Sequence, residues 1–502
     1  MKKDAFFAKM DNLGLALTYD DVRLKSGYSE TMPHEISIES KFSRNVPLKI
    51  PLISAAMDTV TEHRLATEMA FLGGLGVIHR NLTPERQAAE VVRVKNHLNA
   101  RIEKPTCVYE DETIEQLINK RDEEELTFHS FPVLDRENRL VGIITKNDFD
   151  FCDQPSITVK EAMTTQVIKS HPETTIAEAY DMMFKNKKKL LPLVDKEGFV
   201  QGLYVFSDVQ RVITGTSPNC NTDPKGQLRV AAAIGTGEKA LERARHLIKA
   251  NVDVLVIDTA HGDSKPVFET LKAIKRTHSR IDVVVGNISE GPSARRLIDA
   301  GADGIKIGQG PGSICTTRII AGIGSPQVSA VYQCSKAIRG SGIPLCADGG
   351  VRYSGDITIG IGAGADSVMM GSMLAGTLES PGSKIFLNGR QWKYYRGMGS
   401  LSAMLSSRSS RERYRQKDIE KLIPEGVEGM VPYKGKLNDV LVQYIGGLRS
   451  GMGYVGAADI DELHEKADFH RISASGRAES HPHNIQITKE TPNYPGQSGS
   501  QK

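Results

Sequence analysis

The sequence contains a glycine-rich turn that ends on a cysteine, between Gly308 and Arg318. The turn follows the short apolar run 303–307, which is typical of a buried strand, so Cys315 is expected on a loop at that strand's C-terminal end. Glycines let a ligand approach the backbone N–H groups, and an ionised cysteine is a strong nucleophile. The pattern predicts either a nucleophilic cysteine beside a bound ligand or a strand-to-helix turn with a half-buried structural cysteine.

Other apolar runs end in residues of similar chemistry. Asp258, Asn287 and Asp348 each come at or directly after such a run, and Gly349–Gly350 and Gly371–Ser372 form two more glycine-rich turns. Either carboxylate alone is typical of a loop cap. If the strands are parallel and end at one edge, the cysteine, both carboxylates and the amide converge on one site. This shared position favours a functional role for them.

Three of these turns have the composition of a phosphate-binding site. Gly312–Ser313, Gly349–Gly350 and Gly371–Ser372 offer backbone N–H groups and hydroxyls without a Walker lysine. With a phosphate held there, Asp348 would accept hydrogen bonds from ribose hydroxyls and bring the base close to Cys315. The predicted ligand is therefore a nucleoside monophosphate.

The elements that position these residues are apolar runs that alternate with amphipathic segments. Such runs are typical of a parallel α/β sheet buried on both faces. A count of eight favours a (β/α)8 TIM barrel over an open doubly wound sheet. The runs are residues 50–57, 74–80, 229–235, 252–258, 282–287, 304–308, 343–348 and 367–371.

An internal repeat interrupts this pattern after the second strand and its helix. Residues 132–148 match residues 192–208 at a constant offset (192 − 132 = 60). The repeat resembles the cystathionine-β-synthase (CBS) pair, an α+β fold whose cleft binds adenine or guanine nucleotides in related proteins. We expect a tandem CBS domain at 102–214, with repeats at 102–160 and 161–214, between barrel segments 1–101 and 215–502. The alternative is a repeat that only spaces or packs subunits.

A long polar segment follows the eighth strand. It opens at 397–400, is rich in Ser and Arg between 406 and 418, and returns to an apolar pattern near 430. Such a stretch is too long and too hydrophilic for a simple connection. We expect either a mobile lid over the site or a disordered loop. We call residues 397–430 the flap, and Arg411, Arg413 and Tyr414 are its candidates for chemistry.

Composition limits the classes of partner. The 502 residues carry a formal net charge of +3, and no basic block or membrane-length apolar run stands out, so neither nucleic acid nor a membrane is implied. The six cysteines are scattered without CxxC spacing, which argues against zinc or disulfides and for free thiols. A cytoplasmic protein is expected.

Motifs along nearly the whole chain closely resemble the inosine-5′-monophosphate (IMP) dehydrogenase family in its bacterial form. The matching stretches are residues 54–61, 258–262, 308–318, 347–352, 371–372 with 379–382, 395–400 and 425–429. The position of the CBS insertion also matches.

The resemblance implies oxidation of IMP to xanthosine 5′-monophosphate with NAD, a step of guanine nucleotide biosynthesis. Cys315 would form a covalent thioimidate at purine C2, and after NADH leaves, the flap would close so that water releases the product. The implied catalytic residues are Cys315, Thr317, Arg413, Tyr414 and Glu425. Those implied for IMP are Ser54, Met57, Ser313, Asp348, Gly349, Gly350, Gly371, Ser372, Tyr395, Gly397, Met398, Gly399 and Glu425. Those implied for NAD are Asp258, Asn287, Gly308 and Gly310.

The resemblance also implies a potassium ion and a homotetramer. Carbonyls of Gly308, Gly310 and Cys315 would bind the ion, together with Glu479, Ser480 and His481 of a neighbouring subunit. Backbone carbonyls suit such an ion. The tail after Tyr494 matches nothing in the family and is expected to be disordered.

Two other functions stay open at this stage. A guanosine-5′-monophosphate (GMP) reductase with a CBS insertion would share the cysteine loop and the phosphate turns, but that enzyme lacks the Arg413–Tyr414 pair. A non-catalytic nucleotide-sensing regulator would use only the repeat.

Overall fold

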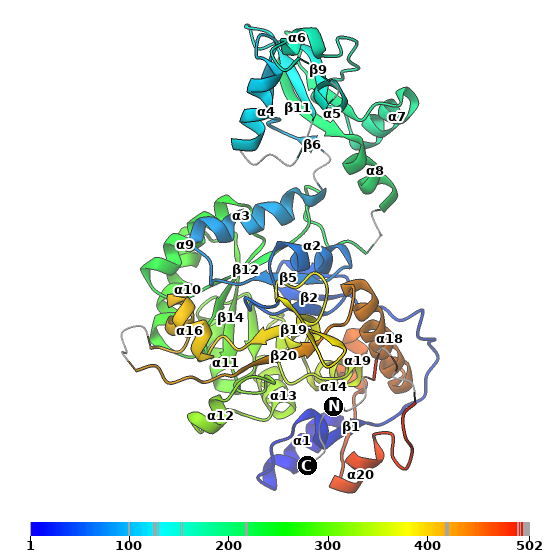
Figure 1. The fold of residues 1–502 in the computed structure, drawn as a ribbon. Coiled ribbons are helices and arrows are strands. Elements are labelled where there is room, and N and C mark those ends of the chain that lie inside the picture. The colour runs from blue at the N-terminus through cyan, green and yellow to red at the C-terminus, as the bar shows by residue number, and fades with distance from the viewer. Residues whose placement is uncertain are drawn as a thin grey trace. The chain divides into compact units, whose positions relative to one another are not determined.

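The computed structural model describes residues 2–98, 101–123, 128, 130–150, 152, 154–215, 219–416, 421–488, 491, 493 and 494 (Figure 1). The chain divides into two compact units, one of Met1–His97 with Asn219–Lys502 and the other of Leu98–Pro218. The tail after Tyr494, expected to be disordered, lies outside the described residues.

The larger unit is a closed barrel of eight parallel strands, which confirms the predicted (β/α)8 fold. The strands are buried along nearly their whole length, as their continuous apolar sequences require. Around the barrel they are β4 (Leu52–Ser54), β5 (Leu75–Ile78), β12 (Ala231–Ile234), β13 (Val254–Asp258), β14 (Asp282–Ile288), β15 (Gly304–Ile307), β16 (Leu345–Asp348) and β17 (Ser367–Met370).

A ring of helices surrounds the strands (Figure 1). Seven follow individual strands, and the long helix α18 completes the ring by packing on both α14 and α2. Common helix-start residues are present. For example, Thr83 caps the N-terminus of α3, and Pro84 is the first residue of that helix. The helices are α2 (His63–Phe71), α3 (Pro84–Lys95), α9 (Glu238–Lys249), α10 (Lys265–Thr277), α11 (Gly291–Asp299), α13 (Gln327–Ile338), α14 (Ser354–Ala363) and α18 (Leu437–Val455).

A hairpin closes the N-terminal end of the barrel. Strands β2 (Ser40–Ser43) and β3 (Val46–Leu48) place Phe42 in the same apolar cluster as inward-facing strand residues. Asp282, at the start of β14, accepts hydrogen bonds from Ser43 Oγ at 2.6 Å and from the Asn45 backbone N–H at 2.8 Å. The C-terminal ends of the strands therefore form the open face on which a site can be built.

The smaller unit contains the repeat. Strands β8 (Ser130–Leu134) and β9 (Leu140–Thr145) match β10 (Leu190–Val194) and β11 (Val200–Val205), and both pairs shift register at the same place, 133/134 and 193/194. Each half has its own apolar cluster. The remaining elements are β6 (Arg101–Ile102), β7 (Val108–Tyr109), α4 (Ile114–Glu123), α5 (Lys146–Asp150), α6 (Val159–Ala162), α7 (Ile176–Asn186) and α8 (Phe206–Gly215). Its identity as a CBS pair stays a prediction.

The flap, within its described residues, is folded onto the larger unit. It contributes α16 (Leu401–Ser406), α17 (Arg408–Arg413) and β20 (Glu428–Pro432), and β20 extends the sheet of β18 (Lys384–Leu387) and β19 (Arg390–Arg396). The other elements of this unit are α1 (Lys2–Asn12), η1 (Tyr19–Asp21), β1 (Val22–Leu24), η2 (Asn96–Leu98), α12 (Thr317–Ile320), α15 (Ser372–Ala375), α19 (Ile460–Lys466), β21 (Phe469–Arg471) and α20 (Ala474–Glu479). Within the described ranges, no helix combines the length and apolar character needed to span a bilayer.

Candidate active site

The C-terminal ends of the barrel strands surround a cavity of about 400 Å³. Nineteen residues predicted from the sequence line it, drawn from strand ends far apart in the chain and from the flap. They are Met57, Asp258, Asn287, Gly308, Gly310, Ser313, Cys315, Thr317, Asp348, Gly349, Gly350, Gly371, Ser372, Tyr395, Gly397, Met398, Arg413, Tyr414 and Glu425. The loops after the late strands thus converge as the barrel architecture requires.

Cys315 lies at the start of a short hydrogen-bonded chain. Its Sγ donates to Thr317 Oγ1 at 3.2 Å, and that hydroxyl donates to Glu425 Oε2 at 2.8 Å. Because the Thr317 hydroxyl both accepts and donates, the chain connects the thiol proton to a carboxylate. This arrangement can remove the proton that must leave before sulfur acts as a nucleophile.

The backbone of the flap's returning segment holds the cysteine loop. Cys315 forms an isolated antiparallel bridge with Gly426. The N–H groups of Thr316 and Val427 donate to the carbonyls of Glu425 and Ile314 at 2.9 and 3.0 Å. The position of Cys315 therefore depends on the segment at 425–427 as well as on β15.

A buried lysine, Lys306, organises the polar wall of the cavity. Its Nζ lies 3.0 Å from Asp258 Oδ1 and 2.7 Å from Asp348 Oδ2, and it also donates to Asn287 Oδ1. Only 1% of its side chain is exposed. Lys306 was not among the predicted site residues, although it is the one charged residue inside the apolar run 304–307. A cation inside a strand that must be buried is a signal that carboxylates lie nearby.

The flap adds a second cation to this wall. Arg413 forms an ion pair with Asp258 through its Nη1, and its backbone carbonyl accepts from the Ala260 N–H at 3.3 Å. Asp258 therefore joins a lysine of the barrel to an arginine of the flap. The flap is docked inside the cavity in this structure.

Tyr414 packs closely against Gly399 of the flap. A Cβ on Gly399 would lie 2.5 Å from the tyrosine ring, so the ring would have to shift to accommodate any larger residue. Burial raises the pKa of the Tyr414 phenol, which therefore stays protonated and able to donate a hydrogen bond. Gly399 thus supports the site without lining the cavity.

The three turns predicted to bind phosphate, Gly312–Ser313, Gly349–Gly350 and Gly371–Ser372, all line the cavity. Gly349 and Gly350 have φ angles of +90° and +82°, which favour glycine and turn the backbone sharply after β16. Beside Gly371, the Tyr395 hydroxyl lies 3.8 Å from Met57 Sδ, and burial raises the pKa of this phenol. The turns and this phenol offer neutral N–H and O–H donors, which suit an anionic group.

Several predicted residues lie away from the cavity. Ser54 is fully buried, and its Oγ accepts from Thr61 Oγ1 at 2.9 Å, so it braces the loop after β4 instead of lining the site. In this single chain, the segment with Glu479, Ser480 and His481 also lies outside the cavity lining, and the His481 ring packs 5.8 Å from that of Tyr353.

The N-terminal lead contributes residues that the sequence did not reveal. Thr18, Tyr19 and Asp20 line the cavity. The Tyr19 ring is buried beside Gly350, and this burial raises its pKa. Gln327 at the start of α13 lines the cavity as well. No motif or spacing marks these residues, because only the folded barrel brings them to its open face.

Three of the other cysteines are thiols whose pKa is raised by burial. All six are free thiols. Burial raises the pKa of Cys107 to about 11 and of Cys346 to about 12, and it raises that of Cys334 as well. These three are structural. Among the residues that the structure describes, no group of three His, Cys, Asp or Glu side chains is arranged to hold a metal ion.

The fold and the site together define the class of the protein, a (β/α)8-barrel enzyme whose cavity is built around a cysteine loop. A family model described as "IMP dehydrogenase / GMP reductase domain" matches residues 16–483. The chain belongs to this family, which confirms the resemblance found in its motifs.

Known relatives match this chain in sequence over nearly their full length. The chain is 49% identical to an inosine-5′-monophosphate dehydrogenase of Aquifex aeolicus (95% of this chain and 97% of the relative). It is 46% identical to those of Halalkalibacterium halodurans (95% and 98%) and Helicobacter pylori (96% and 99%). Among solved structures, a GMP reductase variant of Trypanosoma brucei in complex with guanosine 5′-monophosphate aligns with a TM-score of 0.85, 39% identity and coverage of 94% and 98%.

Proposed function

We propose that the protein oxidises IMP to xanthosine 5′-monophosphate through a covalent adduct on Cys315. The observation that carries this proposal is the hydrogen-bonded chain from Cys315 through Thr317 to Glu425, beside glycine-rich turns in one cavity. The Cys315 thiol passes its proton through Thr317 towards Glu425, and the resulting thiolate adds to purine C2. Loss of hydride from C2 leaves the thioimidate, so a difficult oxidation is divided into two easier steps.

The nucleotide would be held by the walls of the cavity. The N–H groups and hydroxyls at Ser313, Gly349–Gly350 and Gly371–Ser372 would bind its phosphate. Asp348 would accept from the ribose hydroxyls, since Lys306 and Asn287 keep this carboxylate fixed at 2.7 and 2.9 Å. Met57, Tyr395, Gly397 and Met398 would contact the rest of the substrate.

When bound, NAD would accept the hydride from purine C2. The residues fit such a group: Asp258 is a carboxylate suited to ribose hydroxyls, and Asn287 and the loop at Gly308 and Gly310 line the cavity next to it. Arg413 pairs with the same carboxylate. Flap and dinucleotide would therefore use this region in turn, which fits a lid that closes only after oxidation.

The docked flap would then carry out hydrolysis. Arg413 and Tyr414 would orient and activate the water that attacks C2, and Cys315 leaves as the thiol when the product forms. A guanidinium is protonated at neutral pH, so Arg413 would orient the water by donating to it, and the proton of the water would need a neighbouring base. Asp258, which pairs with Arg413, is a carboxylate that could take up this proton.

We further propose a potassium ion in a homotetramer. Carbonyls of Gly308, Gly310 and Cys315 are the oxygen ligands that a monovalent cation prefers, and Asn287 orients the first by donating to it at 2.7 Å. Glu479, Ser480 and His481 of a neighbouring subunit would complete the set. For the smaller unit we propose a CBS pair that takes a purine nucleotide.

A second candidate is favoured by the aligned solved structures, which are named GMP reductases. Such an enzyme would reduce GMP with loss of ammonia. It needs no hydrolytic lid, whereas here Arg413 and Tyr414 are brought to the cavity of Cys315. That placement supports the dehydrogenase.

The deciding experiment mixes the protein with IMP, NAD and potassium and follows NADH by absorbance. We expect NADH from the wild-type chain and none from Cys315→Ala. NADPH consumption with GMP, but no NADH with IMP, would identify a reductase. Activity retained in Cys315→Ala would exclude the covalent route.

A further inference from the structure

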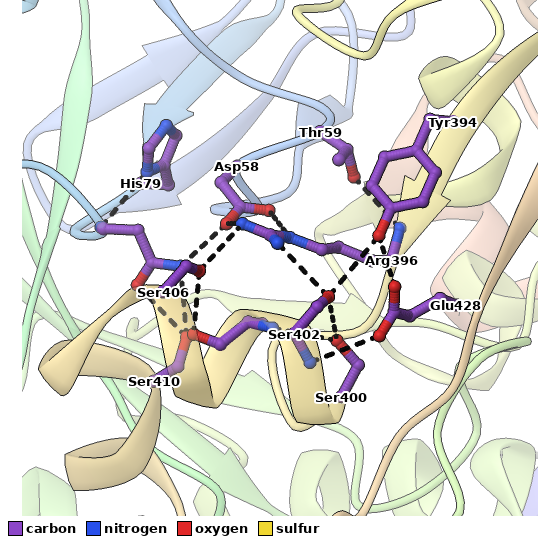
Figure 2. Close-up of polar contacts among 12 residues, drawn as sticks. Asp58, Thr59, His79, Tyr394, Arg396, Ser400, Ser402, Ser406, Ser410 and Glu428 are labelled. Carbon is purple, nitrogen blue, oxygen red and sulfur yellow. Dashed lines mark hydrogen bonds and ion pairs between the residues drawn. The ribbon is translucent and has the colours of Figure 1, made fainter. Parts of the chain in front are cut away.

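Polar contacts outside the cavity hold the flap against the barrel (Figure 2). Arg396, at the end of β19, contacts Asp58 with its Nε at 3.1 Å and its Nη2 at 2.6 Å. The same guanidinium donates to Ser402 and Ser406 of α16, at 3.2 Å each. These contacts join the loop after β4 to the first flap helix.

A second contact reaches the helix that carries Arg413. Asn81 follows β5, and its Nδ2 donates to Asp58 Oδ2 at 2.8 Å and to Ser410 Oγ at 3.1 Å. Ser410 Oγ also lies 3.2 Å from Asn81 Oδ1. Ser410 is 1% exposed, so water does not compete freely for this hydroxyl.

The two contacts differ in what they join. Asp58 and Arg396 both lie outside the flap, so their pair does not depend on a docked flap, unlike the Arg396 contacts with Ser402 and Ser406. Ser410 lies inside the flap on α17, one helical turn before Arg413. Its contact with Asn81 exists only while α17 is docked. The same helix makes a weaker charged contact, with Glu412 Oε2 3.9 Å from Arg80 Nη1.

We propose that Asn81 is a positioning residue that latches the closed flap through Ser410 and so sets how the covalent intermediate divides between hydrolysis and rebinding of the dinucleotide. This inference rests on the proposed function, because only then do flap and dinucleotide compete. Asn81 touches neither substrate nor the reacting atoms; it acts through Ser410 on the position of Arg413.

Loss of this contact shifts the closing equilibrium towards the open flap. A partly buried hydrogen bond corresponds to roughly a 3- to 10-fold change in such an equilibrium. If closure is strongly favoured in the wild type, kcat stays near its value and inhibition by excess NAD appears at a 3- to 10-fold lower concentration. If closure is balanced, kcat itself falls by a similar factor.

The test uses the full chain and measures both quantities, together with the rate of the NADH burst in the first turnover. Ser410→Ala removes the hydroxyl of the latch, Asn81→Ala removes the partner, and the double variant completes a cycle. Ser409→Ala is the matched control, because it deletes the same atom from the neighbouring residue. Thermal unfolding of each variant reports on the fold.

We expect an unchanged burst rate, a lower NAD inhibition constant or lower kcat in Ser410→Ala, and a double variant no worse than Asn81→Ala alone. Ser409→Ala should match the wild type. Unchanged kcat and NAD inhibition in Ser410→Ala, or a burst slowed as much as kcat, would overturn the latch. Absence of NADH from the wild type would overturn the proposed function and the latch with it, so the two failures are distinguishable.

Discussion

Arg413 of the flap pairs with Asp258 at the C-terminal end of β13, and Asp258 is at the same time 3.0 Å from the buried Lys306. One carboxylate thus connects a cation that moves with the flap to a cation fixed in the barrel. When the flap leaves, Lys306 still contacts Asp258, so the carboxylate keeps a charged partner and becomes available to another ligand. This relationship makes alternate use of one region possible without exposing an unpaired buried charge.

Replacing Arg413 by Ala should separate the two stages of the reaction. Removal of a proton-transfer group slows its step by about 100-fold or more, so we expect kcat to fall by that factor while the first-turnover NADH burst keeps its rate. The covalent adduct should accumulate and be visible by intact-protein mass spectrometry. A variant that hydrolyses at the normal rate would remove Arg413 from the mechanism.

Lys306→Met should destabilise the protein severely. The substitution removes the buried cation that contacts both Asp258 and Asp348, and breaking a buried pair of this kind costs about 3–5 kcal/mol. Lys306→Arg keeps the charge and is the matched control. Denaturant unfolding of the two variants measures the difference, and equal stabilities would show that the carboxylates do not depend on the lysine.

Much of the fold was predictable because the barrel strands are almost entirely apolar and are bounded by glycine or a polar residue. The place of Cys315 followed from the same rule, since parallel strands end at one face. Three features were not predictable: the docking of the flap, the position of Tyr19 in the cavity lining, and the hydrogen bond that holds Ser54 against Thr61 and away from the cavity. They depend on contacts between residues hundreds of positions apart, or on which way a side chain turns, and neither leaves a local pattern.

Glu425→Gln should slow formation of the covalent adduct. Gln still accepts a hydrogen bond from Thr317 but cannot take up the thiol proton, so we expect the NADH burst to slow about 10-fold or more at neutral pH. Thr317→Val, which interrupts the chain, should have a comparable effect, whereas Thr317→Ser keeps the hydroxyl and should stay near the wild type. Stopped-flow absorbance resolves the burst. Equal burst rates in Glu425→Gln and wild type would show that the proton takes another route.

The buried residue Lys3 should make the stability of the folded protein depend on pH in the alkaline range. Its Nζ donates to the Gly362 carbonyl at 3.1 Å with the residue 2% exposed, and burial, followed by repulsion from Arg339, lowers its pKa from 10.5 to about 8. Between about pH 8 and 10.5 the unfolded chain therefore binds more protons than the folded one, so this residue's contribution to stability rises with pH in that window and is constant below it. The full change is up to about 3 kcal/mol. Thermal unfolding at pH 7 to 10 should show the stability of the wild type increasing with pH relative to that of Lys3→Met. Lys2→Met, which changes an exposed lysine, should differ from the wild type by a constant amount over this range. A constant difference between wild type and Lys3→Met across this range would contradict the buried-lysine assignment.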